Sequence, residues 1–386
     1  MKKIQLLNKI AKVGLNIFDT SKYEIGENIT KPDGIIVRSA DMLQLEFNPE
    51  LLAVARAGAG VNNIPVERCA EQGIVVFNTP GANANGVKEL AIAALLLASR
   101  DITGGIEWTK SQAGKEGIAK SVEKEKARFS GIEIEGKTLG VIGLGAVGGM
   151  VANAARNLGM DVIGYDPYIT VEAAWSLSRS IKKASGYDEI YKNADYITVH
   201  APATAETKGM FCAASFAKMK DGVRIINLSR ADLVHSQDMI KAIQSKKVAC
   251  YVTDFPTDET AGIDGIIAIP HLGASTNESE DNCAVLAVQE LIEFLENGNI
   301  KNSVNYPDAS MPHSGDSRIC VLHRNIPNML SQISSAVSAE NINIENMLNR
   351  SKKEYAYTIV EINGKIPQNT LDALYAIDGI IRINIY

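Results

Sequence analysis

Three glycines that follow a short apolar run constrain this chain more than any other feature. The run covers residues 139–142, and Gly143, Gly145 and Gly148 come after it. A helix-like apolar pattern comes next, and a second apolar run ends at Asp166. This order is typical of a βαβ unit that binds a dinucleotide: the first glycine permits a tight turn, the second lets the backbone approach a pyrophosphate, and the third lets the helix pack on the strand. The alternative is an ordinary strand–helix turn whose glycines serve packing alone.

Asp166 also indicates which dinucleotide would bind. A carboxylate at the end of the second strand accepts hydrogen bonds from a ribose 2′-hydroxyl and repels a 2′-phosphate. Pro167 and Tyr168 follow it, so no adjacent Arg or Lys would hold the additional phosphate. The sequence therefore predicts NAD rather than NADP.

The composition excludes several classes of protein. The chain has 386 residues, a net charge of −6 and a hydrophobic fraction of 46%, which are typical of a soluble globular protein with two or three domains. No basic block indicates nucleic acid, no apolar run reaches membrane-spanning length, and no metal site is indicated. The five cysteines are scattered without a C-x-x-C pair, which favours a reducing compartment, and we expect a cytoplasmic protein.

Alternating apolar runs and helical patterns predict an α/β fold. Shorter runs at residues 34–37, 53–57 and 74–77, with a helical stretch at 87–99, indicate a small α/β unit. A larger unit follows, in which the runs recur at the spacing of a doubly wound parallel sheet that is buried on both faces. The runs of this larger unit are 139–142, 162–165, 196–200, 224–228, 248–253 and 266–269.

Two polar stretches are expected to connect domains. Residues 104–131 are charged and weakly periodic, so we expect a surface loop. Residues 297–317 are rich in Asn, Ser, Pro and Gly and form a candidate linker. The pattern from residue 318 onward reads strand, helix, strand, strand, helix, strand, which is the ferredoxin-like βαββαβ order.

Side chains that could carry acid–base chemistry lie at the predicted carboxyl ends of strands, where ligands bind in such folds. Arg230 could hold a carboxylate through two parallel N–H bonds. His271 is the candidate base, because imidazole titrates near neutrality. Glu259, or its neighbour Asp258, could orient that ring, and Asp254 could face a nicotinamide carboxamide. Each residue alone could equally be an ordinary surface or turn residue, but their order after the glycine motif favours a site.

The sequence resembles the D-isomer-specific 2-hydroxyacid dehydrogenase family over nearly the whole chain. The motifs that carry the resemblance are Gly143-x-Gly145-x-x-Gly148, Asp166, Asn227-Leu-Ser-Arg230, Asp254-x-x-x-x-Glu259 and Pro270-His271. The family implies a doubly wound Rossmann NAD domain inserted in a flavodoxin-like substrate-binding domain, with the active site in a cleft between them. The boundaries expected on this basis are 1–95 and 280–305 for the substrate-binding domain, 96–279 for the NAD domain, 306–317 for a linker and 318–386 for the C-terminal domain.

The resemblance also implies roles for individual residues. Arg230 would bind the substrate carboxylate, His271 would be the acid–base group and Glu259 would be its partner. The residues expected on the substrate side are Arg38, Ser39, Gly60, Val61, Asn83 and Lys88. The residues expected to bind NAD are Gly143, Leu144, Gly145, Ala146, Val147, Gly148, Asp166, His200, Pro202, Thr207, Leu228, Asp254 and Gly273.

The activity implied is the NAD-dependent oxidation of a phosphorylated 2-hydroxy acid, 3-phospho-D-glycerate, to 3-phosphohydroxypyruvate, which begins L-serine biosynthesis. Arg38, Arg56 and Lys88 are cations that would favour the phosphate. One alternative is a dehydrogenase or reductase for another D-2-hydroxy acid, with glyoxylate or a 2-keto acid as the oxidised form. The other is a nucleotide-sensing interaction protein.

The C-terminal domain resembles ACT domains, which sense amino acids. His323, Asn325 and Asn343 match effector-binding positions, so L-serine is the expected effector and a homodimer or homotetramer is the expected assembly. The alternative is an ACT domain kept only for oligomer contacts. Asn328 stands where the ACT turn usually has Gly, and we expect the turn to survive because Asn tolerates the left-handed conformation.

Overall fold

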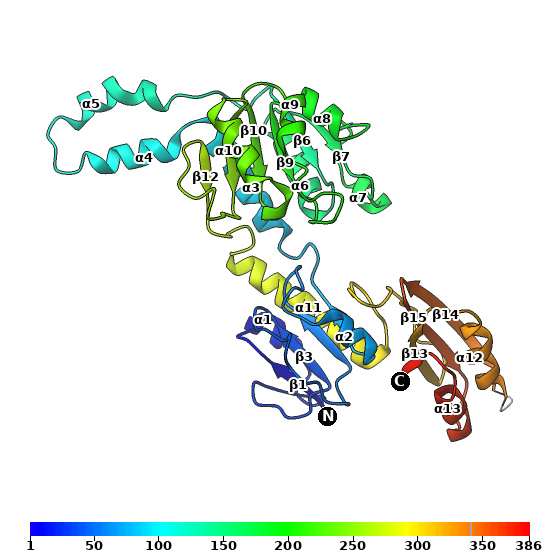
Figure 1. Ribbon diagram of the computed structural model, residues 1–386. Helices are drawn as coiled ribbons and strands as arrows, with labels where there is room; N and C mark the ends of the chain where they lie inside the picture. Colours follow the sequence, from blue (N-terminus) through cyan, green and yellow to red (C-terminus); the bar gives the residue numbers. More distant parts are fainter. Residues whose placement is uncertain (340–341) are drawn as a thin grey trace. The chain divides into compact units, whose positions relative to one another are not determined.

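The computed structural model describes residues 1–339 and 342–386. The chain divides into two compact units, Met1–Asn83 with Asn277–Tyr386 and Ala84–Thr276, and each is described by itself (Figure 1). The divisions expected near residues 95 and 279 lie instead at the first residues of two helices, α3 (Ala84–Ser99) and α11 (Asn277–Asn297). Helix α3 belongs to the second unit because Ala91 and Leu95 pack in that unit's core.

The first unit begins with a flavodoxin-like sheet. Its strands are β1 (Lys2–Leu6), β2 (Tyr23–Gly26), β3 (Gly34–Val37), β4 (Ala53–Arg56) and β5 (Val75–Phe77), and its short helices are α1 (Lys12–Leu15) and α2 (Val66–Glu71). The strands are parallel in the order β2-β1-β3-β4-β5, which confirms the predicted fold of this part. Helix α11 covers the sheet, and its Leu291 and Phe294 share one core with Ile4, Ile36 and Phe77.

The first unit ends with a ferredoxin-like domain. Its elements are β13 (Ser317–Arg324), α12 (Met329–Ser338), β14 (Ile344–Lys352), β15 (Tyr355–Ile362), α13 (Gln368–Tyr375) and β16 (Ile380–Ile385). The antiparallel order β14-β15-β13-β16 confirms the predicted βαββαβ arrangement. Asn328, just before α12, has a φ of 69°, so it takes the left-handed conformation that we predicted for this turn.

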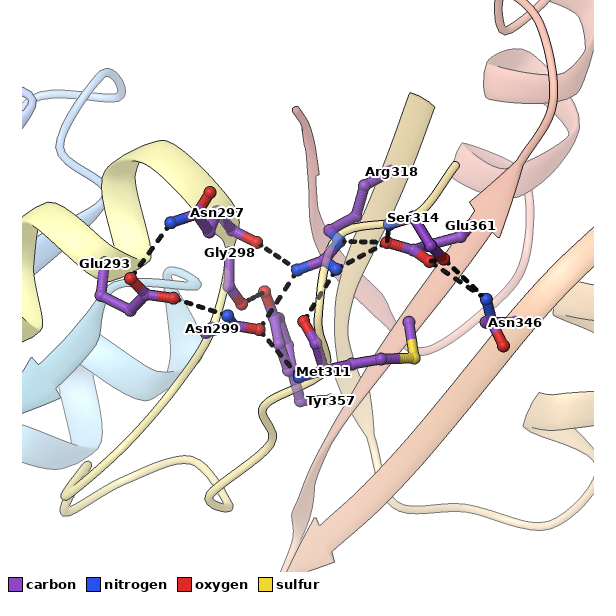
Figure 2. A network of polar contacts seen from close by, with 10 residues as sticks. All are labelled: Glu293, Asn297, Gly298, Asn299, Met311, Ser314, Arg318, Asn346, Tyr357 and Glu361. Atoms are coloured by element: carbon purple, nitrogen blue, oxygen red, sulfur yellow. Dashed lines mark hydrogen bonds and ion pairs between the residues drawn. The ribbon is translucent and has the colours of Figure 1, made fainter. Parts of the chain in front are cut away.

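A buried arginine, Arg318, ties the ferredoxin-like domain to the end of α11 (Figure 2). Arg318 on β13 is fully buried, and its Nη2 lies 2.6 Å from Oε1 of Glu361 on β15. The same guanidinium donates to the backbone carbonyls of Asn297 at 2.7 Å and Met311 at 2.8 Å. The guanidinium therefore fixes three segments of the first unit to one another.

The segment 297–317, which was expected to be a linker, is packed along the edge of the flavodoxin-like sheet. The side chain of Asn305 donates to the carbonyl of Ile74 at 2.9 Å and accepts from the N–H of Val76 at 2.9 Å. Polar side chains that suggested a loose connection thus satisfy backbone groups of an edge strand.

The second unit is a doubly wound domain. Its strands are β6 (Thr138–Ile142), β7 (Asp161–Tyr165), β8 (Lys182–Lys183), β9 (Tyr196–Val199), β10 (Val223–Asn227), β11 (Val248–Thr253) and β12 (Ile266–Ala268). They are parallel in the order β12-β11-β10-β9-β6-β7-β8, as predicted for a Rossmann fold. Its other helices are α6 (Ala146–Asn157), α7 (Val171–Trp175), α8 (Tyr187–Asn193), α9 (Ala213–Lys218), the 3₁₀ helix η2 (Ala231–Leu233) and α10 (Ser236–Gln244).

The prediction of a loop at residues 104–131 was wrong. Most of this stretch lies in α4 (Ile102–Ser111), α5 (Ile118–Glu125) and the 3₁₀ helix η1 (Lys126–Phe129), which extend from the sheet as an arm in Figure 1. The side chain of Asp101 accepts from the N–H of Gly104 at 2.9 Å and so caps α4. The paired glycines at 104 and 105 masked this helix, since glycine has a low helix propensity. Among the described residues, no helix is both long and apolar enough to cross a membrane.

Glu290, in the middle of α11, is a buried carboxyl group whose pKa is displaced. It is 5% exposed, its Oε1 accepts from Nδ2 of Asn302 at 2.6 Å, and burial raises its pKa to about 8. At pH values between its unfolded pKa of about 4.5 and its folded pKa, the folded chain holds a proton that the unfolded chain has lost. The free energy of unfolding should therefore fall as the pH rises through this window, by about 1.4 kcal/mol per pH unit from this group.

Replacing Glu290 with Gln should remove this titration. Urea unfolding at pH 5, 6.5 and 8 is expected to show the variant gaining on the natural protein as the pH rises, by a few kcal/mol in total, on the order of the linkage above. The matched control is Glu278→Gln, an exposed position in the first turn of the same helix, which should leave the pH profile unchanged. Parallel profiles for the Glu290 variant and the natural protein would contradict this prediction.

Candidate functional site

The glycine motif forms a turn and helix start with open space above its second glycine. Gly143 has a φ of +84°, and a Cβ there would lie 2.6 Å from the carbonyl oxygen of His200. A Cβ on Gly148 would lie 1.9 Å from the carbonyl oxygen of Gly143, so the first turn of α6 packs directly on the end of β6. By contrast, nothing lies within 4 Å of a Cβ built on Gly145, the residue before α6. These three environments are what backbone contact with a pyrophosphate requires.

Asp166 is held beside the glycine turn. Its Oδ2 accepts from the N–H of Leu144 at 2.8 Å, and its Oδ1 accepts from the N–H of Tyr168 at 2.8 Å. The carboxylate is therefore fixed at the carboxyl end of β7, next to the residues Ala146 and Val147 that begin α6. This is the place where a ribose diol would meet it.

The other residues predicted to bind NAD lie at the same edge of the sheet. Thr207 donates to the carbonyl of Pro202 at 2.6 Å in the loop after β9, and Leu228 follows β10. Nε2 of His200 lies 3.0 Å from the Thr198 hydroxyl, and burial lowers the pKa of His200 to about 4, so this ring is neutral near pH 7. The predicted set is thus gathered at the carboxyl ends of the parallel strands.

Asp254, at the end of β11, contains an unsatisfied buried acceptor. The residue is 1% exposed, and its Oδ2 accepts from the N–H of Gly273 at 3.0 Å. Its Oδ1 has no hydrogen-bond partner within the described part of the chain. Burial raises the pKa of Asp254, while the Gly273 N–H and the charges of His271 and Arg230 act in the opposite direction. An acceptor left open at this position fits the amide group of a nicotinamide.

Arg230 and His271 both lie close to the ring of Phe255. The guanidinium carbon of Arg230 is 5.9 Å from the centre of the phenyl ring, and the imidazole centre of His271 is 4.5 Å from it. Nη1 of Arg230 donates only to the neighbouring Ser229 carbonyl, at 2.6 Å, within the described residues. The guanidinium and the imidazole thus both lie beside Phe255. Their roles as the holder of a substrate carboxylate and as its base stay a prediction.

Asn227 shapes the loop that presents Arg230, and sequence reasoning gave it no separate role. Its side chain is fully buried, donates to the carbonyl of Arg230 at 2.8 Å and accepts from the N–H groups of Ser229 at 3.1 Å and Arg230 at 3.3 Å. An Asn at a strand end, three residues before an Arg, was the signal that could have identified it. Phe255 carried no comparable signal.

Glu259 is not hydrogen-bonded to His271 in this structure. Its Oε1 accepts from Nε2 of Gln237 at 3.0 Å, and both Glu259 and Asp258 are exposed. Catalytic hydrogen bonds often form only when substrate is bound. The pairing of His271 with Glu259, or with Asp258, therefore stays a prediction.

On the substrate side, Asn8 organises the loop after β3. Its Oδ1 accepts from the N–H groups of Arg38 at 3.1 Å, Ser39 at 3.0 Å and Ala40 at 2.8 Å. Nη2 of Arg38 lies 2.7 Å from Oε1 of Glu280 on α11. Asn8 also escaped sequence reasoning, because its partners lie 30 residues and more away in the sequence.

The loop that contains Gly60 and Val61 follows β4 in the same unit. Nδ2 of Asn78 donates to the carbonyl of Ala59 at 2.6 Å and so holds the start of this loop. Asn83 is the last residue of the unit's first segment. Lys88, however, is on α3 of the second unit, where its Nζ donates to Oδ1 of Asn85 at 2.6 Å. A shared role for Lys88 and the residues of the first unit stays a prediction.

The predicted effector residues are all engaged in hydrogen bonds. His323 is 2% exposed; its Nδ1 lies 2.8 Å from the Arg324 carbonyl, its Nε2 lies 2.8 Å from the Thr358 hydroxyl, and burial lowers its pKa. Asn325 donates to the Lys353 carbonyl at 3.0 Å. Asn343 donates to the Glu345 side chain at 2.8 Å. The two asparagines are more accessible to an effector than the buried imidazole is.

Comparison with known proteins agrees with this geometry. Residues 92–273 match the D-isomer specific 2-hydroxyacid dehydrogenase, NAD binding domain family. Residues 92–273 belong to this family, and the doubly wound unit that contains most of them is its NAD-binding domain. The residues present fit the cofactor, since the glycine turn is open at Gly145 and Asp254 has a free acceptor.

Individual relatives share a more specific name. D-3-phosphoglycerate dehydrogenase of Archaeoglobus fulgidus is 35% identical in an alignment of 299 residues that covers 74% of this chain and 54% of that protein. D-3-phosphoglycerate dehydrogenase 1 of Saccharomyces cerevisiae is 28% identical over 97% of this chain and 84% of its own length. A crystal structure of NAD⁺-bound 3-phosphoglycerate dehydrogenase from Entamoeba histolytica, 28% identical, superposes with a TM-score of 0.61 and covers 79% of this chain and 98% of that one. The chain thus spans little more than half the length of the archaeal relative.

Proposed function

We propose that this chain is an NAD-dependent dehydrogenase that oxidises 3-phospho-D-glycerate to 3-phosphohydroxypyruvate, the first step of L-serine biosynthesis. The observation that carries the proposal is that Arg230 and His271 both lie close to Phe255, at the strand edge that holds the glycine motif. The names of the relatives supply the substrate.

The proposed chemistry assigns one task to each group. Two N–H groups of Arg230 bind the substrate carboxylate and orient the C2 carbon. His271 takes the proton from the C2 hydroxyl as the carbonyl forms, and Glu259 stabilises the imidazolium. NAD, when bound, supplies the acceptor for the hydride that leaves C2. Asp254 orients the nicotinamide through its open Oδ1.

A second candidate is a dehydrogenase for an unphosphorylated D-2-hydroxy acid. The observation that favours it is the ion pair between Arg38 and Glu280 at 2.7 Å, because a carboxylate on that arginine competes with a substrate phosphate. Arg56 and Lys88 are the other cations assigned to the phosphate in the first proposal.

Steady-state kinetics that follow NADH absorbance should distinguish the two substrates. We expect kcat/KM for 3-phospho-D-glycerate to exceed that for D-glycerate and D-lactate by about one to two orders of magnitude, since a hydrogen bond to a charged group contributes about 1.5–3 kcal/mol. Equal or better rates with the unphosphorylated acids would select the second candidate. If none of the three acids is oxidised, both proposals fail.

We further propose that the ferredoxin-like domain acts as an ACT domain, at which L-serine regulates the activity. We also propose that the protein assembles as a homodimer or homotetramer, and that it works in a reducing compartment such as the cytoplasm. Asn325 and Asn343 support the effector site. Ile102, Ile106 and Ile118 on the α4–α5 arm, each at least 40% exposed, support self-association. The five cysteines are all free thiols. In the same assay, a rate and a melting curve unaffected by millimolar L-serine would remove the effector from the proposal.

A further inference from the structure

A polar groove lies within the first unit, between the segment after α11 and strand β14. Its volume is about 600 Å³. One wall contains Asn78, Asn302, Ser303 and Asp308, and the other contains Arg350 and Lys352. The residues predicted to bind NAD, substrate or serine are different from all of these. The groove, formed by strand β14 and the segment after α11, is therefore separate from the predicted NAD, substrate and serine sites.

The two cations of the groove lie side by side on one strand. Arg350 and Lys352 are alternate residues of β14, opposite Tyr357 and Tyr355, so their side chains leave the same face of the sheet about 6.6 Å apart. The guanidinium of Arg350 makes no hydrogen bond or ion pair within the described part of the chain. All of its five N–H donors remain available.

A hydrogen bond holds the Lys352 side chain in place and leaves some of its N–H donors available. Its Nζ donates to the carbonyl of Ser303 at 2.8 Å, which leaves two of the three ammonium protons for a ligand. Burial lowers the pKa of Lys352, and the charge of Asp308 acts in the opposite direction. Asp308 itself would repel an anion that came near it, but its carboxylate can accept from a hydroxyl or ammonium group at the other end of a small ligand.

The walls of the groove are fixed rather than hinged. The Arg318 network ties β13 to the carbonyls of Asn297 and Met311, which flank the segment that forms the first wall (Figure 2). The bond from Lys352 to Ser303 joins the two walls directly. The ammonium of Lys352 is therefore positioned before a ligand arrives, which lowers the entropic cost of binding, whereas Arg350 is fixed only through its backbone in β14.

The groove also adjoins the predicted substrate loop. Asn78 lines the groove, and its side chain holds the carbonyl of Ala59, the residue before Gly60. Its own N–H lies 3.4 Å from the carbonyl of Asn302, on the same wall. Only the side chain of Asn78 would then separate a ligand bound in the groove from the loop that contains Gly60 and Val61.

We propose that this groove binds a small organic anion, with a phosphate or carboxylate group held jointly by Arg350 and Lys352 and a hydroxyl or ammonium group directed to Asp308. This site is additional to the NAD, substrate and serine sites. The proposal concerns binding alone, so it does not depend on the activity proposed above.

Calorimetric titration of the full-length protein with inorganic phosphate and, separately, with malonate tests the site and distinguishes the two head groups. Arg350→Gln and Lys352→Gln should each weaken binding at least tenfold for whichever of the two probes, phosphate or malonate, the natural protein binds. Lys365→Gln, which removes one charge from an exposed turn of the same domain, is the matched control and should bind as the natural protein does. Any phosphate bound by the nucleotide site would be common to all four proteins and cancels in the comparison.

Melting curves establish that the variants are folded, which is expected because Arg350 and Lys352 are both exposed. Loss of one binding event in both groove variants, with retention in Lys365→Gln, supports the proposal for whichever probe shows it. Equal affinity in all four proteins for both probes, or no binding of either probe, overturns it.

Discussion

Replacing His271 with alanine is expected to lower kcat by about 10²–10⁴-fold, the usual contribution of a general acid–base group, while the dissociation constant for NAD stays within about twofold. The ring contacts Phe255 and lies outside the glycine turn, so its loss leaves the residues that hold the dinucleotide intact. The rate is measured from NADH absorbance, and NAD binding is measured by calorimetry without substrate.

The matched control for this experiment is His235→Ala. His235 belongs to the same unit, is exposed, and lies 3.3 Å from Asp238 in a surface pair, so its loss should change kcat by less than about twofold. A His271 variant that turns over as fast as the control would remove His271 from the mechanism, whereas loss of NAD binding would place it in the cofactor site instead.

The same assay can assign the partner of His271. Glu259 is bonded to Gln237 in this structure, and Asp258 is the neighbouring carboxylate. A positioning residue acts through the protonation of the ring, so removing the true partner should lower kcat and move the acid limb of the pH–rate profile, while Gln237→Ala should not. Comparison of Glu259→Gln with Asp258→Asn therefore identifies the carboxylate by the profile and not by the rate alone.

Local patterns predicted the sheets and the glycine turn well, because both depend on neighbours in sequence. The apolar runs of the doubly wound unit coincide with β6, β7, β9, β10, β11 and β12 to within one or two residues. Strand β8 was missed because its residues, Lys182 and Lys183, are exposed and carry no apolar signal. Helices α4 and α5 were missed because their apolar residues face solvent or each other and not a core.

The site could be predicted only in part from the sequence, because the residues that contact its functional side chains are distant from them in the sequence. Arg230 and His271 could be placed at strand ends, but the phenyl ring of Phe255 that both of them approach could not. His323 illustrates the opposite case: its motif predicts effector contact, yet folding buries it against Thr358, which is 35 residues away. Such contacts depend on the pairing of β13 with β15, and no local pattern determines which polar group each strand residue meets.

Arg318 is the residue whose replacement should cost the most stability. Arg318→Leu leaves Glu361 buried with no cation, and breaking a buried ion pair from one side typically costs about 3–5 kcal/mol. The matched control is Arg324→Leu on the same strand, where the side chain is 38% exposed and the guanidinium lies 3.7 Å from Glu354 and 4.7 Å from the centre of the Tyr355 ring. An exposed ion pair contributes about 0–1 kcal/mol and an exposed cation–π contact about 0.5–1 kcal/mol. Urea unfolding at pH 7 measures both variants.

The pH dependence of stability in the natural protein and in Arg318→Leu distinguishes the loss of a charge interaction from the loss of packing. Burial raises the pKa of Glu361, but hydrogen bonds from Ser314 and Arg318 outweigh it and lower the pKa to about 2. The natural protein therefore has this stabilisation in full above the unfolded pKa of about 4.5 and loses it progressively as the pH falls from there through about 2. In Arg318→Leu the buried carboxyl loses its cation and should take up a proton, so its deficit at pH 7 should shrink at pH 4. Arg318→Leu combined with Glu361→Leu should recover part of the loss, because the uncompensated charge is gone while the carbonyls of Asn297 and Met311 still lack their donor. A deficit no larger than that of the Arg324 variant, or one that does not change with pH, would mean that the buried Arg318–Glu361 ion pair does not stabilise this part of the protein.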